Sequence, residues 1–232
     1  MSDAAIILDL TLRRGGAERR ESVRIRQAVI AGWTGRDRAA VETHIRELEA
    51  LGVARPATTP IFYRVAARRL TTAGAIEAAG EESSGEVEFV LLRHGGALYV
   101  GVGSDHTDRK AETYNVTVSK QMCEKPVAPT LWAYDEVVGH WDRLVLRSWV
   151  SARGERVLYQ EGAVSAMLPP DDLIARYANP GGLAEGTLMF CGTLAVKGGI
   201  RPAPRFEFEI EDPVRGQRIA HGYNIVTLPV LG

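Results

Sequence analysis

The chain has 232 residues, of which 45% are apolar and 25% are charged, and its formal net charge is −1. These values are typical of a folded globular protein, and the balanced charge gives no indication of nucleic acid or an anionic membrane as a partner. No apolar stretch is long enough to span a bilayer, and the first residues do not resemble a signal peptide. Cys123 and Cys191 match no zinc or redox spacing. We therefore expect reduced thiols and a cytoplasmic location.

The N-terminal residues predict a β-hairpin. Apolar, β-branched runs at residues 4–12 and 22–30 flank a polar turn at residues 13–21, which contains two adjacent glycines. We treat residues 1–31 as an N-terminal hairpin lobe and residues 32–232 as the main domain.

Residues 37–51 predict an amphipathic helix that ends at a Gly52 cap, because apolar residues recur at helical spacing. His44 lies beside this apolar stripe, and Glu47 follows three residues later, so their side chains are neighbours on one face. Taken alone, the helix favours a half-buried histidine with an incidental helical pair over a functional His–Glu pair.

The remainder of the chain predicts mainly strands, so the fold class is a β-rich α+β protein. A Pro-rich connector leads into a strand at residues 61–65, and residues 114–119 alternate as a strand that ends at Lys120. A short helix at residues 169–177 begins with two prolines and is capped by Asp171. Further strands are expected at residues 97–102, 143–150, 155–160, 187–193, 205–211 and 218–228.

Two acidic residues, Glu86 and Glu88, stand one residue apart in an apolar run, so their carboxylates face the same side of a strand. Like charges this close repel each other, and burying them is costly unless a cation intervenes. A Gly-Gly turn and a second apolar run then lead to Asp105 and Asp108, and one of these supplies a third carboxylate. Such an all-oxygen set suits Mg²⁺ or Mn²⁺. The alternative is a solvated strand face, which is the interpretation we prefer for the alternating acids of residues 206–211.

Several motifs occur together in an order that resembles the fumarylacetoacetate hydrolase family, over about residues 32–225. The family has an H-x-x-E on a lid segment, an entry strand, an E-x-E, an Asp-containing turn, a Lys, and a late Gly-Thr strand. The matching segments here are His44–Glu47, residues 60–64, Glu86–Glu88, residues 104–109, Lys120 and residues 186–194.

The resemblance implies a mixed β-roll with short flanking helices, usually dimeric, with a divalent ion (Mg²⁺, or Mn²⁺ or Ca²⁺) held by Glu86, Glu88 and Asp105. It further implies a metal-stabilised enolate formed when a C–C bond breaks, with His44 as general base on water and Glu47 orienting it. Lys120 would stabilise negative charge. The implied substrate contacts are Arg64, Arg109, Gly192 and Thr193.

The sequence also departs from the family pattern. The spacing from Glu88 to Asp105 is shorter, which implies that a helix is missing, and the Asp-containing turn is one residue shorter. Asp105 is therefore the better ligand candidate, with Asp108 as the alternative. Arg64 replaces the usual Lys, and Leu194 replaces Pro. The chain thus resembles a divergent branch of the DUF2848 type.

The function implied by the resemblance is a metal-dependent hydrolase that cleaves a C–C bond in acylpyruvate-like or 1,3-diketo acids. One alternative is a lyase, acting on a 2-oxo acid by decarboxylation, hydration or tautomerisation. The other is a binding protein that keeps the fold without catalysis. A small-molecule 2-oxo or diketo acid and a second copy of the chain are the expected partners. For Lys120 and Arg109 the plain alternatives are a surface lysine and a structural ion pair.

Overall fold

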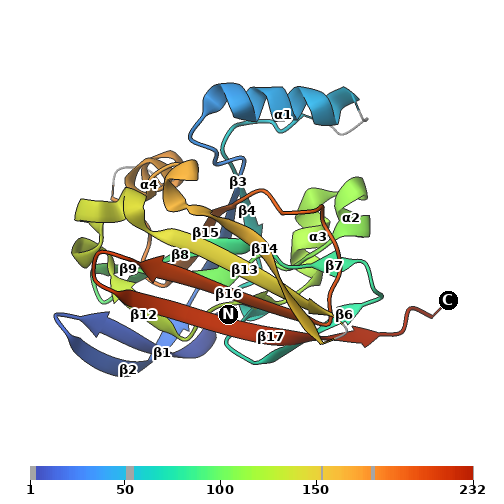
Figure 1. The fold of residues 1–232 in the computed structure, drawn as a ribbon. Helices are drawn as coiled ribbons and strands as arrows, with labels where there is room; N and C mark the ends of the chain where they lie inside the picture. Colours follow the sequence, from blue (N-terminus) through green and yellow to red (C-terminus); the bar gives the residue numbers. More distant parts are fainter. Residues whose placement is uncertain (1–3, 51–54, 153, 179–180, 232) are drawn as a thin grey trace.

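The computed structural model describes residues 4–50, 55–152, 154–178 and 181–231, and it is dominated by two sheets (Figure 1). The main sheet is curled and has eight strands in the order β2-β1-β12-β9-β8-β15-β3-β4. Its strands are β1 (Ile6–Arg14), β2 (Ala17–Ile25), β3 (Gln27–Gly32), β4 (Ile61–Val65), β8 (Val87–His94), β9 (Ala97–Ser104), β12 (Thr130–Ala133) and β15 (Thr187–Thr193).

The second sheet has five strands in the order β14-β13-β16-β17-β6. Its strands are β6 (Ala75–Ala79), β13 (Val145–Ala152), β14 (Glu155–Ala163), β16 (Arg205–Asp212) and β17 (Gln217–Leu228). Two short pairs complete the strands, β7 (Ser83–Ser84) with β10 (Thr107–Asp108) and β5 (Leu70–Thr71) with β11 (Lys125–Pro126).

The helices are short and lie around the sheets (Figure 1). The α-helices are α1 (Arg38–Ala50), α2 (Arg109–Tyr114), α3 (Val116–Met122) and α4 (Pro170–Tyr177). The 3₁₀ turns are η1 (Ala67–Arg69), η2 (Tyr134–Glu136), η3 (Val138–Arg143) and η4 (Val164–Ala166). Among the described residues, no helix combines the length and the apolar character that crossing a membrane requires.

Both faces of the main sheet are buried, which explains why β8 and β9 are almost continuously apolar. Phe89 and Leu91 point from β8 into a core shared with the second sheet. Val90 and Leu92 alternate to the other face and join a core enclosed by the curl of the main sheet, to which β1 and β2 contribute. This arrangement confirms the β-rich α+β prediction.

The N-terminal hairpin exists, with a tighter turn than expected. β1 and β2 meet at Gly15 and Gly16, both at positive φ, and the apolar run at residues 22–30 is divided between β2 and β3. β1 pairs in parallel with β12, so the hairpin extends the main sheet. Residue 31 lies within β3, and the division of the chain there stays a prediction.

Two local predictions were wrong. Residues 114–119 are not a strand, because Asp108 and Asn115 cap two short helices by accepting hydrogen bonds from the amides of Ala111 and Val118. In α4 the N-cap position is Pro169, and Asp171 lies within the first turn, where its charge favours the helix dipole.

The predicted helix at residues 37–51 is confirmed as α1. Asp37 caps it, with Oδ1 accepting hydrogen bonds from the amides of Ala39 (2.9 Å) and Ala40 (3.1 Å). The expected Gly52 cap lies outside the described residues.

Candidate metal centre

The strands of the main sheet bring several candidate residues to one end, which we call the carboxylate end. β8 begins there, and Val87 pairs with Ser104 at the end of the antiparallel β9. Thr193, at the end of β15, pairs with Glu88. β3 runs parallel to β15, so it also ends on this side, where Gly32 pairs with Ile61 at the start of β4.

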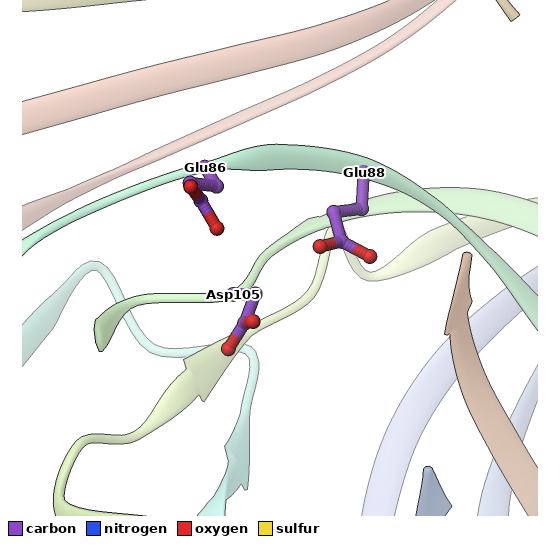
Figure 2. Close-up of side chains that lie close together, drawn as sticks. All are labelled: Glu86, Glu88 and Asp105. Carbon is purple, nitrogen blue, oxygen red and sulfur yellow. The ribbon is translucent and has the colours of Figure 1, made fainter. Parts of the chain in front are cut away.

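Glu86, Glu88 and Asp105 form an acidic cluster at this end. Each offers a carboxylate oxygen, and the three oxygens lie within 4.8 Å of one another. Glu86 precedes β8 and Glu88 is its second residue, so both side chains leave the same side of the chain (Figure 2). Asp105 follows β9 and lies near both glutamates, and its backbone amide donates to the Glu86 carbonyl at 3.0 Å (Figure 2). The fold thus brings together the three carboxylates that the sequence indicated.

Asp108, the alternative third carboxylate, has a structural role instead. Its Oδ1 accepts the Ala111 amide at 2.8 Å as the N-cap of α2, and it is not part of the acidic cluster. The β8–β9 hairpin joins Glu88 to Asp105 through the turn at Gly95 and Gly96, so no helix intervenes.

Asp105 is fully buried between two lysines. Lys120, from α3, donates to Oδ2, and Lys125 lies with Nζ 2.9 Å from Oδ1. Burial alone would raise the pKa of Asp105, but the two ammonium groups lower it below its usual range. Lys125, which is also fully buried, donates in addition to the His106 carbonyl. Asp105 is therefore held ionised and fixed in orientation.

Glu88 is only 3% exposed, and no cationic side chain of the described residues lies within ion-pair distance of it. Its Oε2 accepts the backbone amide of Gly192 at 2.7 Å. Burial, followed by the nearby charge of Asp105, raises the pKa of Glu88 well above its ordinary value. Lys120 is near enough to oppose part of this rise in pKa, but no cation of the described residues is paired with the Glu88 carboxylate.

Glu86 is more accessible and lies beside Arg109, whose Nη2 is 3.2 Å from Glu86 Oε1. Arg109 also donates to Ser84 Oγ (2.7 Å) and to Glu112 (2.9 Å). The Nη2 atom is buried without a hydrogen-bond partner of good geometry, so an unused donor remains beside the cluster.

Gly192 and Thr193 support the acidic cluster. Gly192 has φ +97°, and a Cβ there would lie 1.8 Å from Thr34 Oγ1, so no other residue fits. The Thr193 hydroxyl donates to the Val87 carbonyl (2.8 Å) and accepts from Gln160 Nε2 (2.8 Å). Gln160 Oε1 in turn accepts the Val87 amide at 3.0 Å. Both backbone groups of Val87, which separates the two glutamates, are thereby fixed.

The other predicted residues are placed as follows. His44 and Glu47 lie in α1, but their side chains lie outside the described part of the structure. The segment that contains α1 follows the end of β3 and precedes the start of β4, so both of its connections to the sheet lie at the carboxylate end. Arg64 is exposed on β4, and alternation places it on the face opposite Tyr63, whose ring lies 5.8 Å from Lys120 Nζ. Its role stays a prediction.

The sequence did not indicate three residues that hold the acidic cluster in place. Lys125 and Gln160 belong to no motif, and only the fold places them beside Asp105 and Val87. His106 is buried between Tyr223 Oη (2.8 Å) and Ser83 Oγ (2.9 Å). Burial, with Lys125 and Arg109 nearby, lowers the pKa of His106 to about 3. A neutral histidine thus supports the chain next to Asp105.

The donor set fits a divalent ion such as Mg²⁺. All three groups are hard carboxylate oxygens, and their mutual distances allow one ion to reach each of them. The buried Glu88, which lacks a cationic partner, is the group that such an ion would neutralise.

Comparison with known proteins places the chain in a family. The family described as "Protein of unknown function (DUF2848)" matches residues 31–223. No curated protein matches the chain. Among solved structures, yeast ynq8, a fumarylacetoacetate hydrolase family protein, has 16% identity and a TM-score of 0.62, covering 89% of this chain and 95% of that chain.

Two further solved structures are similar. One is 2-keto-3-deoxy-D-arabinonate dehydratase complexed with magnesium and 2,5-dioxopentanoate, at 15% identity and a TM-score of 0.63, covering 94% of this chain and 79% of that chain. The other is 4-oxalocrotonate decarboxylase from Pseudomonas putida G7, complexed with calcium and acetate, at 16% identity and a TM-score of 0.54, covering 86% and 77%. The chain therefore belongs to the DUF2848 family and has the mixed β-roll fold of the fumarylacetoacetate hydrolase family.

Proposed function

We propose that this chain is a metal-dependent hydrolase that cleaves a C–C bond in acylpyruvate-like or 1,3-diketo acids. The observation that carries the proposal is the acidic cluster, with its three oxygens within 4.8 Å and with Lys120 bonded to Asp105. The similar structures support it, because their names include a fumarylacetoacetate hydrolase family protein and enzymes complexed with magnesium or calcium.

Glu86, Glu88 and Asp105 would hold Mg²⁺, with Mn²⁺ or Ca²⁺ as substitutes. When bound, the ion supplies Lewis acidity toward the adjacent oxo and carboxylate oxygens of the substrate. Cationic residues around the cluster offset part of its negative charge. Lys120 is 8% exposed and contacts Asp105, so its ammonium stabilises the negative charge that develops on the substrate when the C–C bond breaks.

Arg109 and Gly192 orient the acid end of the substrate in this proposal. Arg109 Nη2 is 3.2 Å from Glu86 Oε1 and makes no hydrogen bond, and a planar guanidinium beside the cluster suits a carboxylate. Gly192 acts through Glu88: Thr34 fills the space that a side chain would take, and the Gly192 amide holds the Glu88 carboxylate in place. Thr193 contributes indirectly, because its hydroxyl proton is committed to the Val87 carbonyl.

His44 and Glu47 supply the water chemistry in this proposal. They stand three residues apart on α1, so they share one face of a helix that connects two strands at the carboxylate end. Glu47 orients His44, which takes a proton from a water molecule as the water attacks the distal carbonyl carbon. The C–C bond then breaks and releases the distal fragment as a carboxylic acid. The electron pair of the broken bond forms the enolate of the oxo acid, whose charge Lys120 stabilises until the proton held by His44 is returned to its carbon.

The second candidate is a lyase that acts on a 2-oxo acid. It is favoured by the names of two similar structures, a dehydratase and a decarboxylase, and by the fact that the acidic cluster serves charge stabilisation in either reaction. A homodimer is proposed on the family resemblance.

A thermal-shift screen of 2-oxo and 1,3-dicarbonyl acids, with and without Mg²⁺, tests the site and identifies the substrate class. We expect stabilisation that requires both acid and metal, because only ligands that bind the folded state raise the midpoint. A third possibility, a non-catalytic binding protein, predicts no metal-dependent shift at millimolar Mg²⁺.

Glu47→Gln distinguishes hydrolase from lyase. The hydrolase proposal predicts loss of hydrolysis with retained enolisation of the substrate, measured as exchange of its α-hydrogens with deuterium. The matched control is Glu49→Gln on the same helix, where Glu49 contacts Arg55. Unchanged hydrolysis in Glu47→Gln would refute this assignment.

A further inference from the structure

A hollow of about 250 Å³ lies between α1, the segment before β4 and α4. Arg38, Glu42 and Ile45 line it from α1, and Trp33, Leu168 and Arg176 line it from the body of the protein. We call it the α1 hollow. Its volume is enough for a few heavy atoms of a small organic ligand.

The α1 hollow adjoins the carboxylate end through Thr34. Trp33 lines the hollow and precedes Thr34, which is buried and packs directly against Gly192. The amide of Gly192 donates to Glu88 of the acidic cluster. The carbonyl of Thr34 accepts the amide of Leu168, another lining residue, at 2.7 Å. Two residues in contact, Thr34 and Gly192, therefore connect the wall of the hollow to the acidic cluster.

The charge of the α1 hollow is positive. Arg38 and Arg176 form no ion pair with any carboxylate of the described residues, whereas the neighbouring Arg36 is paired with both oxygens of Asp142. Glu42, the acid in the lining, is already engaged by Arg55 at 2.7 Å and 3.1 Å. Two arginines that line one hollow and have no ion-pair partner among the described residues favour an anion there.

Apolar surface accompanies these charges. Ile45 and Leu168 contribute aliphatic walls, and Trp33 contributes an indole. Trp33 has φ +58°, a left-handed conformation that is costly for a bulky residue and that persists only where the surroundings hold it, as at ligand-binding sites. The combination suits a carboxylate carried on a short apolar stem.

We propose that the α1 hollow binds the far end of the substrate, and that this end carries a carboxylate. The substrate class is then a 2-oxo acid with a second acidic group, whose near end lies at the acidic cluster. The placement of the near end at the acidic cluster rests on the proposed function. The assignment of Arg38 and Arg176 to the distal carboxylate rests on the lining of the hollow itself.

A matched pair of probes tests the proposal. 2-Oxoglutarate and 2-oxopentanoate have chains of equal length and differ in a distal carboxylate against a methyl group. Calorimetric titration of the wild-type protein in Mg²⁺ should give an affinity for 2-oxoglutarate at least about tenfold higher, the gain expected from one charge-assisted hydrogen bond. The Arg38→Gln/Arg176→Gln double variant should lose this preference and keep its affinity for 2-oxopentanoate.

Controls keep the outcomes distinct. Arg20→Gln, at an exposed position of β2, should keep the preference, and Arg38→Lys should retain part of it. A preference that survives in the double variant, or no preference in the wild type, would overturn the proposal. Glutarate without Mg²⁺ tests the hollow alone: weaker binding to the double variant than to the wild type supports it, and equal binding counts against it. Binding of both oxo acids that does not depend on Mg²⁺ would refute the metal site instead.

Discussion

Two regions of the molecule carry glutamates in the same alternating pattern, and they have opposite environments. At the carboxylate end, Glu86 and Glu88 converge with Asp105. On β16, Glu207, Glu209 and Glu211 form what we call the β16 ladder. Its acids pair with Arg147, Arg156, Arg205 and Arg218, and the side chain of Arg218 is 65% exposed.

The difference shows that alternation alone does not indicate a site. In the β16 ladder each carboxylate has an arginine partner, so even the buried Glu209 has its charge balanced by a cation. At the carboxylate end, Glu88 is buried with a backbone amide as its bonded partner, and the cations that are present contact Asp105 and Glu86. A site for a divalent ion requires this local deficit of positive charge.

The largest expected effect is on stability. Lys125→Met removes one of the two lysines that contact the fully buried carboxylate of Asp105. We therefore expect the free energy of unfolding of the metal-free protein to fall by about 3–5 kcal/mol. Arg218→Met in the β16 ladder, where the side chain is largely exposed, should cost at most about 1 kcal/mol. Urea unfolding measures both. Equal losses would contradict the difference in environment.

The next effect is on catalysis. Lys120→Met removes the buried ammonium beside the acidic cluster, and we expect kcat to fall by about 10²–10³-fold, as for loss of a group that stabilises developing charge. Lys197→Met is the matched control, because Lys197 is about half exposed and lies 3.6 Å from Glu161. Steady-state kinetics on the substrate found by the thermal-shift screen gives the comparison. A kcat unaffected by Lys120→Met would remove the lysine from the mechanism.

A smaller effect is expected on metal affinity. Gln160→Leu removes the bonds to Val87 and Thr193 that fix the segment between the two glutamates, and we expect affinity for Mn²⁺ to fall by about 10–100-fold. Ser148→Ala removes a different hydrogen bond to the same amide oxygen, so it should retain most of the affinity. If the two variants bind Mn²⁺ equally, Gln160 has no positioning role.

The smallest effect concerns pH. Burial raises the pKa of Glu207, but hydrogen bonds from Arg156 and Arg205 hold the pKa below its usual value. A lowered folded-state pKa contributes stability above the unfolded pKa of about 4.5, and this contribution is lost as the pH falls through the folded pKa. Arg156→Gln should therefore destabilise the protein by at most about 1 kcal/mol at pH 7 and by less at pH 3. The destabilisation that remains at pH 3 reflects the lost packing of the Arg156 guanidinium on the Trp149 ring, 3.8 Å away. A difference that grows on acidification would contradict this sign.

The sequence predicted most of the strands, α1 and the Glu86–Glu88 pair, because each depends on short-range spacing. Lys120 was assigned to a strand, since the alternation in residues 114–119 outweighed the capping residues Asp108 and Asn115. The choice between Asp105 and Asp108 required the structure, because only the fold shows which carboxylate caps a helix. Lys125 and Gln160 are 37 and 72 residues distant from Glu88 in the chain (125 − 88 and 160 − 88), and no local pattern could connect them.

The central claim is that the acidic cluster binds a divalent ion and the β16 ladder does not. Titration of the metal-free protein with Mn²⁺, followed by the electron paramagnetic resonance signal of free Mn²⁺, tests it directly. We predict one bound ion per chain, affinity reduced more than about 100-fold in Glu88→Gln, and wild-type affinity in Glu207→Gln. Absence of binding at millimolar Mn²⁺, or equal binding by wild type and Glu88→Gln, would contradict the account.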